Sequence, residues 1–443
     1  MNFRLLKANS ILVILALLAS FLPIQNAAAQ SSGITFLVNN TADVADHTIN
    51  GICSAGFVTG GPCTLRAATM EAGHQAVFQE VTIKIPTGTY NLTIPPTSFP
   101  GGSTGDLDMG EVQQGNTIHI TAADLSAPRP VIEASAIQDG IFFLRSTTKV
   151  VMTHLTLTGG KVETTSSWSR SGGAIYNAGK LELNSVIVIG NSSVCAANYA
   201  YCYHRGGGIA NYGSLTIKDS DITLNEAYWG AAIYSEGSGE VNIMRTRIFS
   251  NLTHITALEI EDNPVLNIVN SSISNNGYPG GYSTTLRVHC CTKINISSST
   301  FVHKEPTGFM IDLGDINGPQ EPIITIRDSI LYSDSQTCKS TANTSWAGSS
   351  YNIANDGFCT HLVGPGDLQN TDPMISMAGS LFGIDPVHLP LPGSPALNHR
   401  PGNCSYAGAP LLHDQRGIPR ADGRCDTGAF ERNFPAFLPA IRR

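Results

Sequence analysis

A short pattern of apolar and polar positions recurs along the middle of the chain. Apolar residues occupy its first, third and eighth positions, and the sixth position is often Ser or Thr. The seven copies are VVMTHLTL from Val150, LELNSVIV from Leu181, LTIKDSDI from Leu215, VNIMRTRI from Val241, LNIVNSSI from Leu266, INISSSTF from Ile294 and ITIRDSIL from Ile324. Successive copies start 31, 34, 26, 25, 28 and 30 residues apart. Because alternating apolar and polar residues are typical of a strand with one buried face, each copy predicts a strand.

One asparagine keeps register with this repeat. It lies ten residues after the start of four successive copies, at Asn191, Asn225, Asn251 and Asn276. Asparagine tolerates left-handed backbone and can hydrogen-bond through its side chain in tight turns. We therefore expect the four side chains to stack as a ladder of amides at one corner of a coil.

A second strand precedes three of the copies. The segments that contain it are GGAIYN from Gly172, GGGIAN from Gly206 and GAAIYS from Gly230. Their small residues permit a tight backbone, and the isoleucine of each segment should point into the core. Rungs of about 25 to 30 residues with at least two strands can stack roughly 4.8 Å apart into parallel sheets. The spacing predicts an all-β chain folded as a right-handed parallel β-helix, whereas a β-propeller, the alternative, needs repeats of about 40 residues or more.

The ends of such a coil need covers, because open sheet edges and exposed core invite aggregation. The stretch from Leu65 to Gln75 places Leu65, Ala68 and Ala72 on one face and predicts an amphipathic helical cap. After about residue 336 the repeat is lost and Pro and Gly are frequent, which predicts an irregular closing module. The predicted regions are a cap at 30–80, a β-helix at 81–335, a closing region at 336–432 and a tail at 433–443.

The first 29 residues have the pattern of a secretory signal peptide. Arg4 and Lys7 precede an apolar run from Ile11 to Leu22, and three alanines end at Ala29. The run is shorter than the roughly 20 residues that span a bilayer, although an N-terminal membrane anchor is the alternative. We expect cleavage after Ala29 and a secreted or cell-surface mature chain without a membrane span.

Composition and cysteine spacing agree with export. The net charge of −8 argues against nucleic acid as a partner. In an exported chain, closely spaced cysteines predict local disulfides, and metal binding, the alternative, finds no CxxC pair here. The four separated pairs are Cys53–Cys63, Cys195–Cys202, Cys338–Cys359 and Cys404–Cys425. The adjacent Cys290 and Cys291 could form a vicinal disulfide, stay reduced or pair elsewhere.

Several segments resemble known exported proteins. GGAIYNAGKLELNSV and GGGIANYGSLTIKDSDITLN are similar to the repeats of polymorphic outer-membrane-type β-helix proteins. CTLRAATMEAG, from Cys63 to Gly73, resembles the CSLREA-type N-terminal region, with Thr64 in place of Ser. DQRGIPRADGRCDTGAFE, from Asp414 to Glu431, resembles the choice-of-anchor Q region. The resemblance implies a bacterial exported protein with a pectin-lyase-like solenoid, and it implies no particular reaction.

Insertions between rungs form the first set of candidate functional residues. Extra residues enter at 160–171, 192–205, 226–229, 252–256 and 277–284, always just before the inner strand, so they should gather at one edge. Their aromatic rings could bind a polysaccharide or cell-surface glycan, or could simply pack the loops onto the coil. The candidate ligand-binding residues are Trp168, Arg170, Tyr201, Tyr203, His204 and Trp229.

The second set follows the buried apolar residue of each inner strand. When the strands are aligned, these positions read Tyr176, Ala210, Tyr234, Glu259, Arg287 and Asp312. Glu259, Arg287 and Asp312 would stack as acid, base and acid, and they are the candidate catalytic residues. A uronate lyase uses a base with carboxylates that bind calcium, and a glycoside hydrolase uses two carboxylates about 5 to 9.5 Å apart. The alternative is a structural row of salt bridges between rungs.

These features together favour a noncatalytic exported scaffold that serves adhesion or glycan binding. A β-helix polysaccharide lyase or glycoside hydrolase is the competing function. The sequence contains no HExxH, P-loop or GHG segment. It predicts no cofactor and no dedicated metal site, although Asp106 and Asp108 of GDLDM could ligate calcium.

Overall fold

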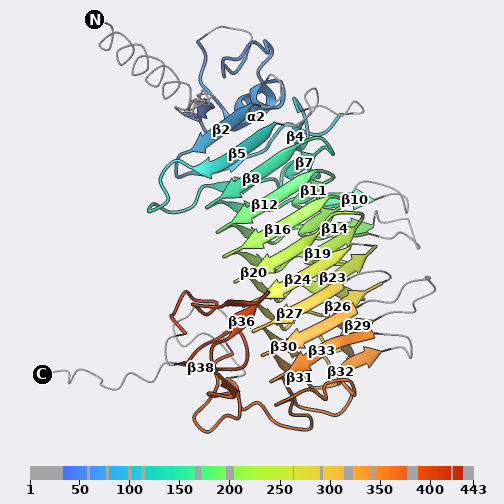
Figure 1. Cartoon of the computed structure of the whole chain (residues 1–443). Helices are drawn as coiled ribbons and strands as arrows, with labels where there is room; N and C mark the ends of the chain where they lie inside the picture. The colour runs from blue at the N-terminus through green and yellow to red at the C-terminus, as the bar shows by residue number, and fades with distance from the viewer. Residues whose placement is uncertain are drawn as a thin grey trace, which may run out of the picture. The chain divides into compact units, whose positions relative to one another are not determined.

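Three long parallel sheets wind around one apolar core in the computed structural model of the chain (Figure 1). Within each sheet, every strand pairs in parallel with the equivalent strand of the next rung. The predicted all-β, right-handed parallel β-helix is confirmed.

The structure describes residues 33–56, 60–75, 79–97, 102–110, 116–164, 171–195, 204–262, 264–289, 293–313, 323–340, 345–376, 388–420 and 423–432. The predicted signal peptide at 1–29 and the predicted tail at 433–443 lie outside these residues. The described residues from Ile34 onward form a single unit. In the described ranges, no helix has both the length and the apolar character that a membrane crossing needs.

The eleven-stranded sheet carries the start of the repeated pattern. Its strands are β1 (Ile34–Leu37), β2 (Glu80–Ile85), β5 (Thr117–Ala122), β8 (Lys149–Thr153), β12 (Lys180–Asn184), β16 (Ser214–Lys218), β20 (Val241–Met244), β24 (Val265–Val269), β27 (Lys293–Ser297), β30 (Ile323–Arg327) and β33 (Ser345–Ser350). The first and third pattern positions are buried and stacked: Leu181 pairs with Leu215, and Leu183 pairs with Ile217. The alternation therefore buries one face of this sheet, as predicted.

The ten-stranded sheet follows after a tight turn. Its strands are β3 (Thr89–Asn91), β6 (Val131–Glu133), β9 (Thr156–Thr158), β13 (Ile187–Ile189), β17 (Asp221–Thr223), β21 (Arg247–Phe249), β25 (Ser272–Ser274), β28 (Thr300–His303), β31 (Ile330–Ser333) and β34 (Ile353–Ala354). The fifth pattern position makes the turn with left-handed backbone, for example at Ser185 (φ 56°) and Asp219 (φ 52°). The sixth position links rungs through its hydroxyl, since the Ser271 N–H donates to Ser299 Oγ at 3.2 Å. This bond explains the preference for Ser or Thr there.

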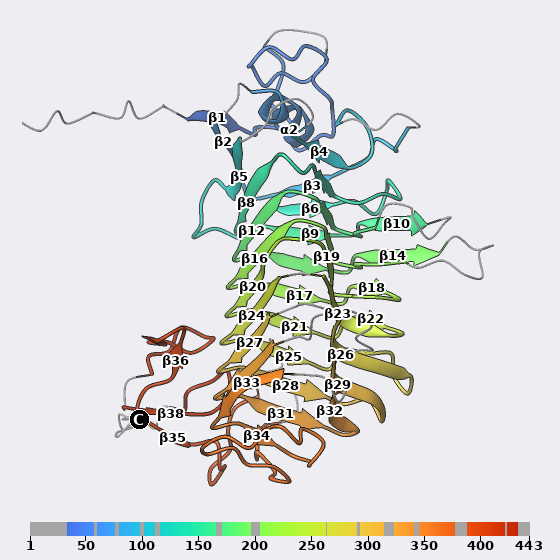
Figure 2. The ribbon, with the colours of Figure 1, turned by 45° about the vertical axis from the view of Figure 1, so that its right-hand side comes forward.

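The nine-stranded sheet contains the inner strands, three of which directly follow the predicted runs of small residues. Its strands are β4 (Leu107–Met109), β7 (Phe142–Leu144), β11 (Ile175–Asn177), β15 (Ile209–Asn211), β19 (Ile233–Glu236), β23 (Thr256–Glu261), β26 (Tyr282–Val288), β29 (Thr307–Leu313) and β32 (Gln336–Ser340). Parts of four insertions pair as a smaller sheet: β10 (Lys161–Thr164), β14 (Ser192–Cys195), β18 (Glu226–Ala227) and β22 (Leu252–Thr253). Figure 2 shows this sheet projecting beside the coil.

The predicted asparagine ladder is present at the start of these insertions. Each side-chain amide donates to the Oδ1 of the next asparagine, at 3.0 Å from Asn191 to Asn225, 3.0 Å from Asn225 to Asn251 and 2.8 Å from Asn251 to Asn276. All four residues are fully buried. Because each Oδ1 also accepts the backbone N–H of the preceding asparagine, the ladder satisfies polar groups that the turn would otherwise bury without partners.

A helix covers the N-terminal end, as predicted. Helix α2 (Leu65–Gly73) begins after Thr64, whose side chain accepts from the Ala67 N–H, and it packs against β2 and β4. The Cys53–Cys63 disulfide pins the segment that leads into it. Arg66 of this helix is fully buried and pairs with Asp43 at 2.6 Å.

The coil is longer than the predicted range of 81–335. Strand β1 pairs with β2 at the N-terminal end, and β32, β33 and β34 add a further rung at the other end. This last rung was missed because its strand β33 lacks the apolar alternation and pairs with β30 through a register shift.

After β34 the chain first covers this end of the coil, where Cys359 and Leu362 join the main core and Leu368 bridges to Ile353. The part of the closing region that follows lies beside the coil (Figure 1). It contains two short antiparallel pairs, β35 (Arg400–Pro401) with β38 (Arg424–Cys425) and β36 (Ser405–Tyr406) with β37 (Ala409–Pro410). The Gln415 side chain inserts between rungs and donates to Thr246 O at 2.7 Å while its carbonyl accepts from Ser272 at 2.6 Å. The long range of these contacts explains why a local pattern could not predict them.

The cysteines match the predicted pairing where they are described. Cys338–Cys359 and Cys404–Cys425 are disulfides, as is Cys53–Cys63. Cys195 is also disulfide-bonded, but Cys202 lies outside the described residues, as do Cys290 and Cys291.

Candidate functional site on the nine-stranded sheet

The outward positions of the nine-stranded sheet form one continuous row along the coil. In register, the row reads Asp108, Phe143, Tyr176, Ala210, Tyr234, Glu259, Arg287, Asp312 and Lys339. The structure therefore brings Glu259, Arg287 and Asp312 onto three neighbouring rungs, in the order that the alignment of inner strands predicts. The period of two along each strand places a second outward row two residues further on.

Four aromatic rings line up along the first half of this row; Phe143, Tyr176 and Tyr212 are partly exposed, whereas Tyr234 is fully buried. Phe143 stacks on Tyr176 with ring centroids 4.6 Å apart and an interplanar angle of 11°. Tyr212, from the second row, lies between Tyr176 and Tyr234 at centroid distances of 5.1 and 6.1 Å. Because Ala210 is small, the Tyr212 ring can lean over it and close the gap. The result is an unbroken aromatic strip across four rungs, which we call the aromatic strip.

An arginine and two carboxylates surround the last ring of the aromatic strip. Arg205 lies over the Tyr234 ring at 4.7 Å and pairs with Glu236 at 3.2 Å. The Tyr234 hydroxyl lies 2.7 Å from Glu236 Oε2 and 2.8 Å from Glu261 Oε2. The single phenol O–H can donate to only one of these two carboxylate oxygens. Burial raises the pKa of Glu261, and the nearby charge of Glu259 adds to the rise, so Glu261 holds its proton more readily than an ordinary carboxyl.

Glu259 forms the centre of the charged half of the surface. Its side chain is fully buried, and its Oε1 lies 2.8 Å from His289 Nε2 and 3.6 Å from Arg287 Nε. Glu259 Oε2 has no hydrogen-bond partner among the described residues. The Arg287 guanidinium also lies over the Trp229 ring at 4.7 Å, so an insertion residue covers the pair. We name Glu259, Glu261, Arg287 and His289 the charged cluster.

Asp312 extends the charged cluster by one rung. Its Oδ2 lies 3.4 Å from Lys339 Nζ, and Lys339 also lies over the Phe309 ring at 5.3 Å. Burial raises the pKa of Asp312, while Lys339 and Arg287 oppose the rise. Acid and base alternate along this part of the row, which is the arrangement of a salt-bridge ladder.

Three side chains of the charged cluster could hold a metal ion. One ligand atom each from Glu259, Glu261 and His289 lies within 4.8 Å of the others. The mixed oxygen and nitrogen donors suit a transition metal better than calcium, which prefers oxygen ligands alone. The possible calcium ligand Asp108 instead lies 3.8 Å from Arg145. Calcium binding remains a prediction.

Two of the predicted ligand-binding residues can be placed, and they lie at different positions. Trp229 covers the charged cluster, as described above. His204 belongs to a separate row of rings with Tyr228, His254 and Tyr278, beside the small sheet of β10, β14, β18 and β22, which we call the insertion sheet. Burial lowers the pKa of His204 to about 4, so its Nδ1 can accept the Tyr228 N–H at 2.8 Å. Trp168, Arg170, Tyr201 and Tyr203 lie outside the described residues.

Sequence reasoning missed several residues of this surface. They are Phe143, Tyr212, Glu236, Glu261 and His289. A period-two reading would have found Tyr212, Glu261 and His289, because each follows a first-row residue by two positions. Arg205 lies in the predicted insertion at 192–205, but its contacts with Tyr234 and Glu236 could not be foreseen, since they depend on how the insertion folds.

The solved structures that are similar to this chain include a pectate lyase and a rhamnogalacturonan lyase. Pectate lyase Pel9A shares 15% identity at a TM-score of 0.43, covering 91% of this chain and 98% of its own. A rhamnogalacturonan lyase shares 12% identity at a TM-score of 0.42, covering 72% of this chain and 87% of its own. No family model and no curated protein matches the chain. The resemblance of Cys63–Gly73 and Asp414–Glu431 to exported-protein regions remains a prediction.

Proposed function

We propose that this protein is a noncatalytic exported scaffold that binds a glycan chain along the outer face of its nine-stranded sheet. The observation that carries the proposal is the aromatic strip, which continues directly into the charged cluster. Flat rings offer apolar faces suited to sugar rings, and the polar groups beside them can bond to hydroxyls. A row that follows the coil axis suits an extended polymer better than a small molecule.

The pairing within the charged cluster supports binding rather than catalysis. A catalytic carboxylate or base must be free to exchange a proton with the substrate. Glu259 instead shares Oε1 with His289 and Arg287, and Arg287 is held between Glu259 and Trp229. Asp312 has Lys339 beside it. These contacts hold the Glu259, Arg287 and Asp312 side chains in place.

The test is a glycan-binding panel with a matched pair of variants. Removal of two rings, Tyr176→Ala with Tyr212→Ala, should weaken the best binder by at least about tenfold, since each ring contributes about 1 kcal/mol. Tyr332→Ala is the control, because Tyr332 lies on the ten-stranded sheet with Lys304 over its ring at 5.1 Å. Equal affinity of the double variant and the control would overturn the proposal.

A polysaccharide lyase or glycoside hydrolase is the second candidate function. The buried Glu259 Oε2 without a partner and the raised pKa of Glu261 favour it, because unsatisfied and perturbed carboxyls concentrate at catalytic sites. The same panel should be analysed for reducing ends and unsaturated products. We expect none from the wild-type protein. Product release that disappears in Glu259→Gln would instead establish catalysis at this cluster.

A further inference from the structure

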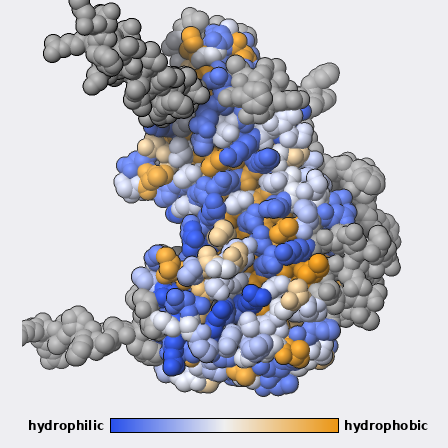
Figure 3. All heavy atoms as spheres, in the orientation of Figure 1, coloured by the Kyte–Doolittle hydropathy of each residue, from blue (hydrophilic) through white to orange (hydrophobic). Residues whose placement is uncertain are grey.

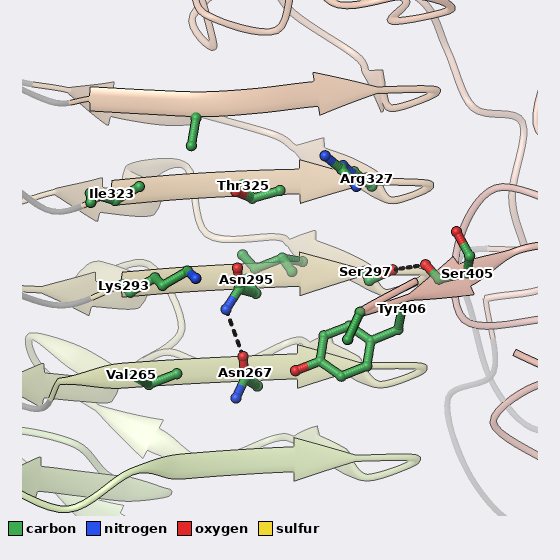
Figure 4. A pocket seen from close by; sticks show the side chains of 13 residues that line it. Val265, Asn267, Lys293, Asn295, Ser297, Ile323, Thr325, Arg327, Ser405 and Tyr406 are labelled. Atoms are coloured by element: carbon green, nitrogen blue, oxygen red, sulfur yellow. Dashed lines mark hydrogen bonds between the residues drawn. The ribbon is translucent and has the colours of Figure 1, made fainter. Parts of the chain in front are cut away.

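A second recess lies on the eleven-stranded sheet, away from the aromatic strip. It has a volume of about 570 Å³ and lies between the outer face of strands β24, β27 and β30 and the hairpin of β36 and β37 (Figure 4). Figure 3 shows the molecular outline indented beside this C-terminal module. The volume is within the range of about 300 to 1,000 Å³ that small-molecule sites occupy.

The hairpin is fixed in place, so the recess is part of the fold. Ser297 Oγ donates to the Ser405 carbonyl at 3.2 Å, and the Cys404–Cys425 disulfide holds the residue immediately before β36. Figure 4 shows the Tyr406 ring extending over the sheet near Asn267. Burial, and then the charge of Glu240, raise the pKa of Tyr406, so its hydroxyl remains a neutral donor at neutral pH.

The floor of the recess is polar and regular. Asn267, Asn295 and Thr325 pair across three neighbouring strands. Asn295 donates to Asn267 Oδ1 at 2.7 Å, and Asn267 donates in turn to Asn242 at 2.7 Å. This chain of amides ends at Asn295, whose side-chain oxygen faces Thr325 on the neighbouring strand (Figure 4). The floor therefore presents amide and hydroxyl groups that can bond to sugar hydroxyls.

The charge of the recess is opposite to that of the protein. Lys293 and Arg327 are exposed lining residues, and the lining residues that the structure describes include no carboxylate. Asp328, the neighbour of Arg327 in sequence, is engaged elsewhere, because its Oδ2 lies 2.5 Å from Arg400. The chain as a whole carries a net charge of −8. Two cations line the recess, whereas the acid that acts on Tyr406, Glu240, is not a lining residue, so the recess favours a negatively charged ligand.

We infer that this recess binds a short anionic saccharide, with Lys293 and Arg327 on its acid groups and the Tyr406 ring against a sugar face. The combination of cations, an aromatic wall and an amide floor recognises charge, ring and hydroxyls at once. A carboxylate or a sulfate on the sugar would satisfy the same cations. This site is independent of the aromatic strip, and either could fail without the other.

The experiment is calorimetric titration of the purified protein with three probes: trigalacturonate, a sulfated heparin disaccharide and neutral maltotriose. At least one anionic probe should bind, with an affinity that falls as salt rises, and maltotriose should not. Binding of the carboxylate probe, the sulfate probe or both identifies which acid group the site accepts. Failure of both anionic probes, or equal binding of maltotriose, would overturn the inference.

Variants locate the binding. Replacement of both cations, Lys293→Gln with Arg327→Gln, should lower the affinity for the anionic probe by about tenfold or more, since charge-assisted hydrogen bonds are lost. Lys180→Gln is the matched control, because Lys180 begins β12 on the same sheet and lies outside the recess. Tyr406→Leu keeps every charge and should also weaken binding. Equal loss in the Lys180 control would show nonspecific attraction, and retained affinity after Tyr176→Ala with Tyr212→Ala would separate this site from the aromatic strip.

Discussion

Removal of one ladder amide, Asn251→Ala, should destabilise the protein far more than removal of a similar amide on the surface. Asn251 Oδ1 accepts both the backbone N–H of Asn225, at 3.1 Å, and its side-chain amide, at 3.0 Å. Its own amide donates to Asn276 Oδ1 and to the carbonyls of Ile222 and Phe249. The substitution therefore leaves two buried hydrogen-bond donors of Asn225 without an acceptor, and each loss costs about 1 to 3 kcal/mol of stability. We expect a loss of about 2 to 5 kcal/mol.

The control is Asn242→Ala, which removes an amide of the same kind from the row of Asn242, Asn267 and Asn295 on the outer face of the eleven-stranded sheet. Asn242 accepts one bond, from Asn267 at 2.7 Å, and water can replace it. Its loss should cost about 0.5 to 1.5 kcal/mol. The assay is denaturant unfolding of both variants, with hydrogen exchange of the Asn225 amide as a local readout. Equal unfolding midpoints, or an Asn225 amide that stays protected in Asn251→Ala, would refute the reasoning.

Three further predictions concern the cap, the C-terminal module and the insertion sheet. Replacement of Cys53 and Cys63 by Ser opens a loop with a sequence separation of 10 and should lower the free energy of unfolding by about 2 to 3 kcal/mol. Hydrogen exchange should show that the amides of α2 lose protection, and unchanged protection would contradict this prediction. Burial raises the pKa of Asp328 to about 6, although Arg400 opposes it, so the folded state binds a proton more tightly than the unfolded state. Wild-type stability relative to Asp328→Asn should therefore fall as pH rises from about 4 through 6, by up to about 3 kcal/mol, and a pH-independent difference would be inconsistent with the raised pKa. Burial, and then His254, lower the pKa of His204 to about 4, so imidazole NMR should show a neutral ring down to about pH 5. The contribution of this ring to stability is present above the unfolded pKa near 6.5 and is lost as the pH falls towards 4. A titration midpoint near 6.5 would show that the ring is not buried as described.

Much of the fold could be predicted because each rung repeats a local rule. The asparagine ladder and the row of Glu259, Arg287 and Asp312 follow from counting residues within aligned strands, since stacked rungs convert sequence register into spatial adjacency. The position of the cap helix followed from its apolar face.

The rest depends on contacts that a local pattern does not contain. Tyr212 joins the aromatic strip because a small neighbour leaves space for its ring, and Arg205 reaches Tyr234 from an insertion. The recess on the eleven-stranded sheet exists because residues near Tyr406 fold back onto strands that are distant in sequence, as the Ser297–Ser405 separation of 108 shows. Such long-range docking is set by side-chain complementarity rather than by periodicity.

The most direct test of glycan binding on the nine-stranded sheet is side-chain footprinting of the tyrosines with and without the best oligosaccharide from the panel. Hydroxyl-radical labelling followed by mass spectrometry reports the solvent access of each ring separately. Binding along the aromatic strip predicts that Tyr176 and Tyr212 become protected while Tyr332 is unchanged. Unchanged labelling of Tyr176 and Tyr212 with saturating ligand, or protection confined to Tyr406, would contradict the account.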